Sequence, residues 1–141
     1  MSVRTLSLTL PVPPSVNNQY VTVGRRRVLS RTAKAFHHDV KVILGEFSMR
    51  PEYDEEWIAS LRNQRLACDL LFYFETPFRR DLDGGLKIAL DAVCAVLGVD
   101  DRYIVALTLA KHLDPLRPRL ELELGIAEGW EMDQQYVVLD S

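Results

Sequence analysis

The sequence contains little cysteine, no long apolar run and, from residue 120 onward, no basic residue. Two cysteines in 141 residues are too few for the disulfide framework of a small secreted domain. No stretch approaches the roughly 20 apolar residues of a membrane-spanning helix, and the first ten residues lack the apolar core of a secretion signal. We therefore expect a cytoplasmic protein with no membrane association, in which Cys68 and Cys94 are buried thiols.

Charge is distributed unevenly along the chain. The net charge of -3 does not by itself indicate a nucleic-acid-binding protein. However, residues 1–45 hold seven lysines and arginines against the single acid Asp39, whereas residues 120–141 hold six acids. The N-terminal part is therefore basic enough to contact phosphate groups.

The length and the 48% hydrophobic content predict one domain with a proper core. Apolar periodicity predicts strands at 3–10, 66–75, 103–110 and 119–124, a hairpin at 20–29, and helices at about 32–47 and 84–97. We predict the α+β class: a mixed sheet of about four strands plus a hairpin, packed with two helices. This domain spans residues 1–126, and an acidic tail spans residues 127–141.

Some elements carry more specific expectations. The continuous apolar run at 66–75 is typical of a central strand buried on both faces, and the alternation at 119–124 predicts one solvent-exposed face and an edge position. Residues 50–64 form a loop or a short helix. Ser30 or Thr32 caps the first helix, Asp83 caps the second, and Gly98 ends it.

Five aspartates and one lysine occupy residues 81–101: Asp81, Asp83, Lys87, Asp91, Asp100 and Asp101. An extended backbone before the helix places the carboxylates of Asp81 and Asp83 on the same side. Clustered carboxylates with a nearby lysine are typical of a site for Mg²⁺ and phosphate. In the alternative interpretation Asp83 is only a cap, Lys87 and Asp91 are an ion pair, and Asp100 and Asp101 form a turn.

Candidate DNA contacts lie mainly in the basic part. The candidates are Arg25, Arg26 and Arg27 in the hairpin, Arg31 and Lys34 in the first helix, Arg79 and Arg80 before the acidic motif, and Asn17 and Asn18 after the first strand. The alternatives are a solvated hairpin turn and an ordinary turn after a strand. Adjacent helical residues point about 100° apart, so His37 and His38 are interpreted as surface residues rather than a metal-binding pair.

The order of these elements resembles the RusA family of Holliday junction resolvases, which are often carried by phages and prophages. The resemblance extends from about Leu8 to Glu123. It rests on Pro13-Pro14-Ser15-Val16-Asn17-Asn18 behind the first strand, the capped helix at 32, and Arg80-Asp81-Leu82-Asp83 followed by Lys87, Asp91 and Asp100-Asp101. The sequence departs from the family at Gly84, where asparagine is usual.

The resemblance implies a RusA-like fold and a homodimeric, Mg²⁺-dependent endonuclease, with Mn²⁺ as a substitute metal, that resolves four-way DNA junctions by paired nicks in recombination or repair. It assigns Asp81, Asp83 and Asp101 as metal-binding catalytic residues and Lys87 as the essential lysine. Asp100 competes with Asp101 as a ligand, and Asp91 is a supporting residue. Two alternatives stay open: a catalytically silent junction-binding dimer, which Gly84 motivates, and a nuclease acting on flaps or forks.

Overall fold

The computed structural model describes residues 5–76 and 81–128, apart from the side chain of Val16. Arg79, Arg80 and nearly all of the predicted acidic tail lie outside the described residues.

A four-stranded mixed sheet forms one layer of the protein. Its strands are β1 (Thr5–Leu10), β4 (Leu66–Phe74), β5 (Ile104–Leu113) and β6 (Arg119–Ile126), in the order β1-β6-β4-β5. β5 pairs in parallel with β4, and the other neighbours are antiparallel. The predicted α+β class is confirmed. The predicted edge position of the last strand is wrong, because β6 pairs with β1 on one side and β4 on the other.

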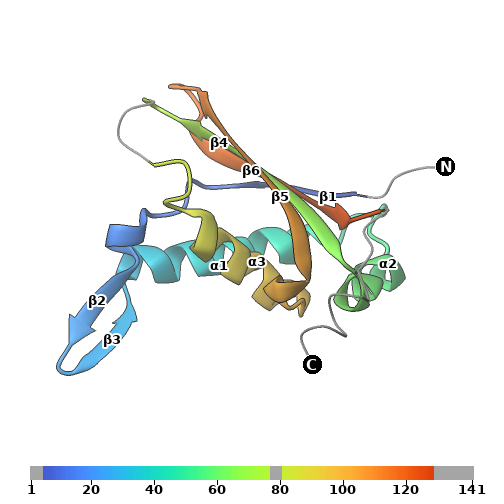
Figure 1. Cartoon of the computed structure of the whole chain (residues 1–141), viewed down its shortest axis with the longest axis horizontal. Helices are drawn as coiled ribbons and strands as arrows, with labels where there is room; N and C mark the ends of the chain where they lie inside the picture. The colour runs from blue at the N-terminus through green and yellow to red at the C-terminus, as the bar shows by residue number, and fades with distance from the viewer. Residues whose placement is uncertain (1–4, 77–80, 129–141) are drawn as a thin grey trace, which may run out of the picture.

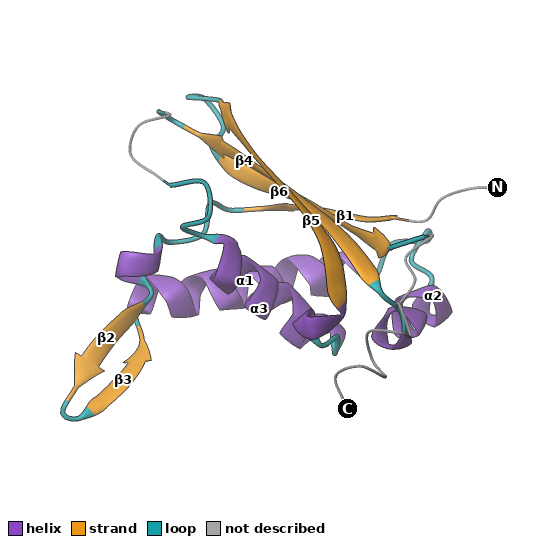
Figure 2. Ribbon diagram, in the orientation of Figure 1, coloured by secondary structure: helices purple, strands orange, loops and turns teal. Residues whose placement is uncertain are grey.

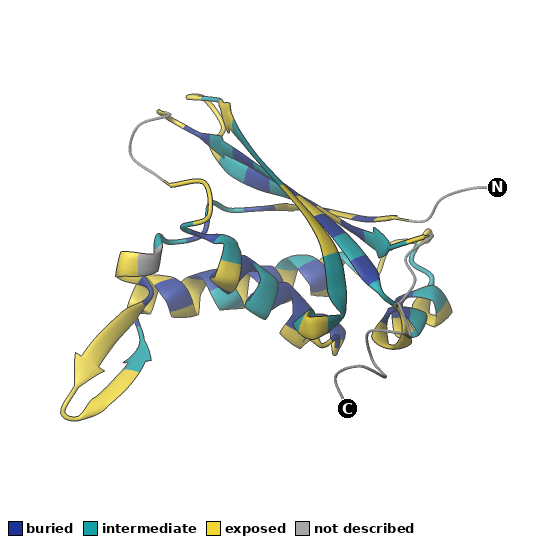
Figure 3. Cartoon of the chain, in the orientation of Figure 1, coloured by how far each residue is buried: buried dark blue, intermediate teal, exposed yellow. Residues whose placement is uncertain are grey.

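Two long helices cover one face of this sheet (Figures 1 and 2). They are α1 (Arg31–Phe47) and α3 (Leu86–Leu97). Every second residue of β1, β4 and β6 lies in the core between the sheet and the helices, whereas no residue of β5 is fully buried. Each buried leucine or phenylalanine contributes about 1.5–3 kcal/mol. The buried strand residues include Leu6, Leu8, Leu10, Leu66, Leu70, Phe72, Leu120, Leu122 and Leu124. Figure 3 shows this burial as dark blue segments on the sheet and helices.

β4 is central in the sheet, as predicted, but it is not buried on both faces. Its residues alternate between buried and more exposed positions, and Asp69 is exposed. The helices lie on one side only, so a nearly continuous apolar sequence was a misleading indication of a two-sided core. A third helix, α2 (Glu55–Ser60), falls in the segment predicted as a loop or short helix.

Local capping explains where the helices begin and end. The Ser30 hydroxyl accepts a hydrogen bond from the Ala33 amide, which confirms Ser30 as the α1 cap. Gly98 ends α3 in the left-handed conformation, with φ 71°, as predicted. The predicted cap at Asp83 is wrong, because the N-cap position of α3 is Gly85 and no side chain caps it.

The predicted hairpin is present and projects beyond the helical layer (Figure 1). Its strands are β2 (Tyr20–Val23) and β3 (Arg26–Leu29), with Gly24 at φ 63° in the turn between them. The positive φ explains a glycine at this position. Only Arg25 of the three arginines lies at the tip, since Arg26 and Arg27 belong to β3.

The cysteine prediction is also confirmed. Cys68 and Cys94 are buried and free, and burial is the main cause that raises their pKa values to about 12 and about 11. His38 is exposed and His37 is half-buried. Within residues 5–76 and 81–128, no helix has the length and apolar character needed to cross a membrane.

Candidate functional site

Lys87 lies between two carboxylates at the start of α3. Its Nζ is 2.8 Å from Asp91 Oδ1 and 3.4 Å from Asp101 Oδ2. The hydrogen bond to Asp91 is the main cause that raises the pKa of Lys87, and Asp101 adds to it. The lysine side chain is nevertheless 72% exposed, so the structure keeps its charge beside two acids and within reach of a ligand. The ion pair of Lys87 and Asp91 that the alternative interpretation predicted is present, but Asp101 joins it.

The turn after α3 brings Asp101 to this cluster. Gly98 ends the helix, and the buried Val99 anchors the turn in the core. Asp101 then begins a short 3-10 helix, Asp101–Tyr103, that leads directly into β5. The sequence could not show whether this turn returns to the helix, and the structure shows that it does.

Asp100 points to a different partner. Its carboxylate accepts hydrogen bonds from the Arg102 amide at 2.9 Å and from the Arg102 guanidinium at 2.9 and 2.7 Å. The hydrogen bond from the guanidinium is the main cause that lowers the pKa of Asp100. The two adjacent acids are therefore distinct: Asp101 contacts Lys87, whereas Asp100 caps the 3-10 helix.

Asp81 and Asp83 lie in the turn that precedes α3, and both side chains are exposed. The Gly84 amide donates to the Asp81 carbonyl at 3.2 Å, and the Leu86 amide donates to the Asp83 carbonyl at 3.1 Å. The expectation of an extended backbone is thus wrong, and strand-like alternation does not set the direction of these side chains. We name residues 81–85 the acidic turn.

The donor chemistry of these residues fits Mg²⁺, because carboxylate oxygens are its usual protein ligands. Within the described part of the chain, however, no three histidine, cysteine, aspartate or glutamate side chains lie close enough together to hold a metal ion. The structure therefore brings Asp101 and Asp91 to Lys87 but does not gather Asp81, Asp83 and Asp101 into one group.

Sequence reasoning missed Gln19. Its side chain is only 4% exposed, and its Nε2 donates to the carbonyl of Pro14 at 3.0 Å and to that of Gly84 at 3.1 Å. This amide links the loop after β1 to the acidic turn, 65 positions away. A glutamine in a polar segment carries no periodic or motif signal, so only the fold could reveal it.

The two asparagines that were predicted to contact DNA differ in their hydrogen bonds. Asn17 and Asn18 are both exposed in a 3-10 helix, Val16–Asn18. Asn18 Nδ2 donates to Ser15 Oγ at 3.2 Å, and its carbonyl accepts from the Ser30 hydroxyl at 2.6 Å. Both asparagines line an open cleft of about 950 Å³. The proline-rich loop after β1, the base of the hairpin and the first turns of α1 form its walls.

The basic side chains of the hairpin are exposed. These are Arg25, Arg26 and Arg27, and we name them the hairpin arginines. The Arg27 guanidinium lies 4.8 Å from the centre of the Tyr20 ring. Arg31 and Lys34 are exposed in the first turns of α1, and Arg31 lines the same cleft as the asparagines.

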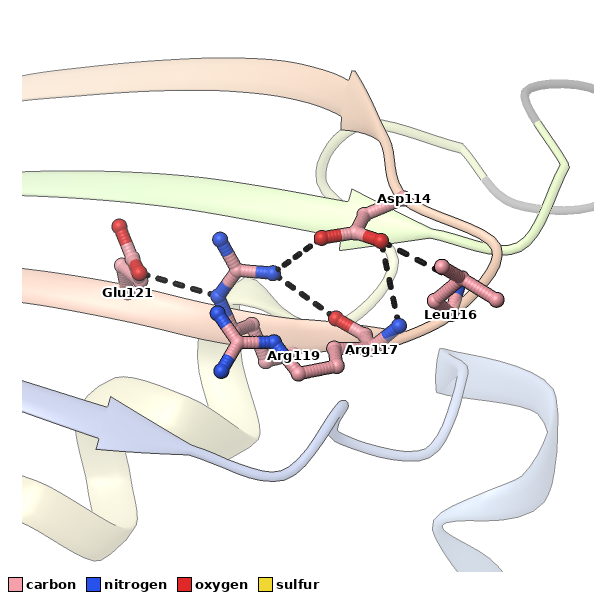
Figure 4. A network of polar contacts seen from close by, with 5 residues as sticks. All are labelled: Asp114, Leu116, Arg117, Arg119 and Glu121. Carbon is pink, nitrogen blue, oxygen red and sulfur yellow. Dashed lines mark hydrogen bonds and ion pairs between the residues drawn. The ribbon is translucent and has the colours of Figure 1, made fainter.

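A second basic residue between carboxylates lies at the turn from β5 to β6 (Figure 4). Arg119 contacts Asp114 at 2.7 Å and Glu121 at 3.0 Å, and its guanidinium lies 3.9 Å from the centre of the Tyr73 ring. The hydrogen bond from Arg119 is the main cause that lowers the pKa of Asp114. Only 16% of the Arg119 side chain is exposed.

Comparison with protein-family models and with curated protein sequences finds no match for this chain.

Proposed function

We propose that the protein is a Mg²⁺-dependent endonuclease of the RusA type that acts as a homodimer on four-way DNA junctions. The observation that carries the proposal is the exposed Lys87, which contacts Asp91 and Asp101 at 2.8 and 3.4 Å. Lys87 is the second residue of α3, so this cluster begins two positions after the acidic turn. An accessible cation can bind an anionic substrate, and the carboxylates beside it can hold the metal ion that the proposed reaction requires.

The carboxylates supply the ligands in this proposal. Asp81, Asp83 and Asp101 would hold the metal ion, and Asp101 is preferred over Asp100 because Arg102 already occupies the Asp100 carboxylate. Mg²⁺ or Mn²⁺ bound there would supply an activated water and polarise the scissile phosphate. Asp101 makes the longer of the two contacts of Lys87, so its carboxylate rather than that of Asp91 would be the one to hold a metal ion.

Lys87 would offset the charge that develops on the phosphate during hydrolysis. Its pKa is raised above the ordinary lysine value, so it is fully protonated at neutral pH. Asp91 would act as a supporting residue, because the 2.8 Å contact fixes the lysine along the helix and leaves the other protons of the ammonium group for the substrate.

The hairpin arginines, Arg31 and Lys34 would bind DNA phosphates outside the reacting site. All five side chains are exposed, and the hairpin projects from the body of the protein (Figure 1). Two-fold symmetry follows from the reaction: a junction is resolved by two symmetric nicks, and one chain with one site supplies both only as a dimer.

The test is cleavage of a labelled four-way junction beside a linear duplex of the same sequence, with Mg²⁺ and with EDTA. We expect paired nicks in the junction alone, dependent on the metal, and their loss in Asp83→Asn with junction binding retained. Wild-type turnover by Asp83→Asn would contradict the assignment.

A second candidate is a catalytically silent junction-binding dimer. The observation that favours it is that the described residues do not gather three metal ligands. Junction binding without any metal-dependent nick in the wild-type protein would select this candidate. Equal cutting of flaps, forks and four-way junctions would instead identify a nuclease with broader substrate selectivity.

A further inference from the structure

Gln19 occupies a buried position between two parts of the proposed site. Its backbone carbonyl accepts a hydrogen bond from the Ser30 amide at 2.8 Å, at the start of α1. Its side-chain amide donates both to the Pro14 carbonyl and to the Gly84 carbonyl. One residue thus joins the proline-rich loop, the first turn of α1 and the acidic turn.

The link to Gly84 reaches the centre of the acidic turn. Gly84 follows Asp83 directly, and its amide already donates to the Asp81 carbonyl at 3.2 Å. With its carbonyl held by Gln19, Gly84 is restrained through both of its backbone polar groups. The positions of Asp81 and Asp83 therefore depend on a backbone that Gln19 helps to fix.

The other side of Gln19 leads to the DNA-contacting elements. Asn17 and Asn18 precede it directly, and β2 of the hairpin begins at the next residue, Tyr20. A shift of this segment on binding would be transmitted through the Gln19 side chain to the acidic turn, because that side chain donates directly to the Gly84 carbonyl.

We propose that Gln19 is a positioning residue that holds the acidic turn in place relative to the loop and hairpin that bind DNA. Its role in catalysis rests on the proposed nuclease function. The inference also assigns a role to Gly84: in this chain its backbone carbonyl is the acceptor for an amide from the N-terminal loop.

The chemistry of the position favours a primary amide. A single Nε2 carries two N–H groups, which match the two carbonyl acceptors. Leucine has a similar volume and no donor, so Gln19→Leu would leave both carbonyls without this partner. Alanine leaves space for water at the same carbonyls, so Gln19→Ala should fold even if Gln19→Leu does not.

The first measurement is amide hydrogen exchange without metal in wild type, Gln19→Leu and Gln19→Ala. We expect the Gly84 and Leu86 amides to exchange about tenfold faster in both variants, the factor that corresponds to about 1.4 kcal/mol. Amides in β4 and β6 should be unchanged. Gln64→Leu is the matched control, because Gln64 is exposed and lies in the segment just before β4, away from the hairpin.

The second measurement is Mn²⁺ affinity by electron paramagnetic resonance, together with kcat and KM for junction cleavage. We expect Mn²⁺ affinity and kcat to fall about tenfold in both Gln19 variants, while KM and junction binding change less than about twofold. A purely structural role would instead lower the amount of folded protein and leave Mn²⁺ affinity per folded molecule unchanged.

The outcomes separate this inference from the proposed function. Unchanged exchange of the Gly84 and Leu86 amides in Gln19→Ala would overturn the positioning role, as would wild-type Mn²⁺ affinity in that variant. A wild-type protein that binds no Mn²⁺ and cuts no junction would overturn the nuclease proposal and the catalytic part of this inference, whereas faster exchange would still establish Gln19 as the anchor of the acidic turn.

Discussion

Two clusters in this protein each place one basic side chain between two carboxylates, but they differ in exposure. Lys87 is 72% exposed and makes one short and one longer contact. Arg119 is 16% exposed and makes ion pairs at 2.7 and 3.0 Å. Ion pairing by itself therefore does not distinguish the proposed site at Lys87 from the structural contact at Arg119.

The use of donor groups separates the two clusters. The Arg119 guanidinium donates to Asp114, to Glu121 and to the Arg117 carbonyl (Figure 4). It also lies 3.9 Å from the centre of the Tyr73 ring. Arg119 therefore stabilises the turn between β5 and β6. Lys87 has a compact ammonium group that is open to solvent, so a ligand can reach it without dismantling the fold.

The largest expected effect concerns the two adjacent acids. Asp101→Asn should lower junction turnover on the order of a thousandfold, because it removes the carboxylate proposed as a metal ligand beside Lys87. Asp100→Asn should lower turnover less than about fivefold, because the Asp100 carboxylate is engaged by the amide and guanidinium of Arg102 rather than by Lys87. Single-turnover kinetics on both variants measure the difference. Equal losses would show that proximity to Lys87 does not distinguish them.

Arg119→Met should reduce stability rather than activity. The substitution leaves Asp114 and Glu121 without their cation and removes the guanidinium from the Tyr73 ring. We expect the Tm to fall by about 5 °C, with unchanged turnover per folded molecule. Thermal unfolding followed by circular dichroism measures this change. Arg117→Met, at an exposed neighbouring arginine, is the control and should leave the Tm within about 1 °C.

The hairpin arginines should affect binding without affecting chemistry. Replacing Arg25 and Arg26 together by glutamine should reduce the slope of log affinity against log salt by about 2, since each lost phosphate contact contributes about 0.9. Turnover at saturating protein should be unchanged. Junction-binding titrations at several salt concentrations measure the slope. The same slope as wild type would exclude the hairpin from the DNA interface.

The smallest effect is a pH dependence at Cys94, which lies on α3 with Lys87 and Asp91. Burial first, then the charges of Asp101 and Asp91, raise its pKa to about 11. The unfolded thiol ionises near its ordinary value, so the folded state keeps its proton longer and stability should fall as pH rises from about 9 to 11. Denaturant titrations across this range measure the fall, to which buried Cys68 also contributes, and Asp101→Asn should weaken the part that is due to Cys94. A stability that rises with pH would contradict the assigned pKa.

Much of the fold could be predicted because local signals agree with the tertiary structure. Ser30 and Gly98 mark helix boundaries through their own chemistry, and alternating leucines define the buried face of β1 and β6. Sheet order could not be predicted. The sequence of β6 is polar on one face whether it lies at an edge or between two strands, so its central position depends on pairing with β1 and β4.

The candidate site was predictable in composition but not in geometry. Spacing placed Lys87 and Asp91 on one helical face, one turn apart, because helix geometry is local. Three features depend on tertiary structure: the contact of Asp101 with Lys87, the separate partner of Asp100 and the buried amide of Gln19. The turn at residues 81–85, in place of the expected extended backbone, could not be predicted from the sequence either.

The most direct measurement is single-turnover cleavage of a labelled four-way junction by Lys87→Met and Arg119→Met side by side, in Mg²⁺ and at a temperature where both are folded. We expect Lys87→Met to cut at least about a hundredfold more slowly than wild type, with junction binding and Tm unchanged. Arg119→Met should cut at the wild-type rate. Wild-type cleavage by Lys87→Met, or equal losses in both variants, would contradict the claim that the exposed cluster performs the chemistry.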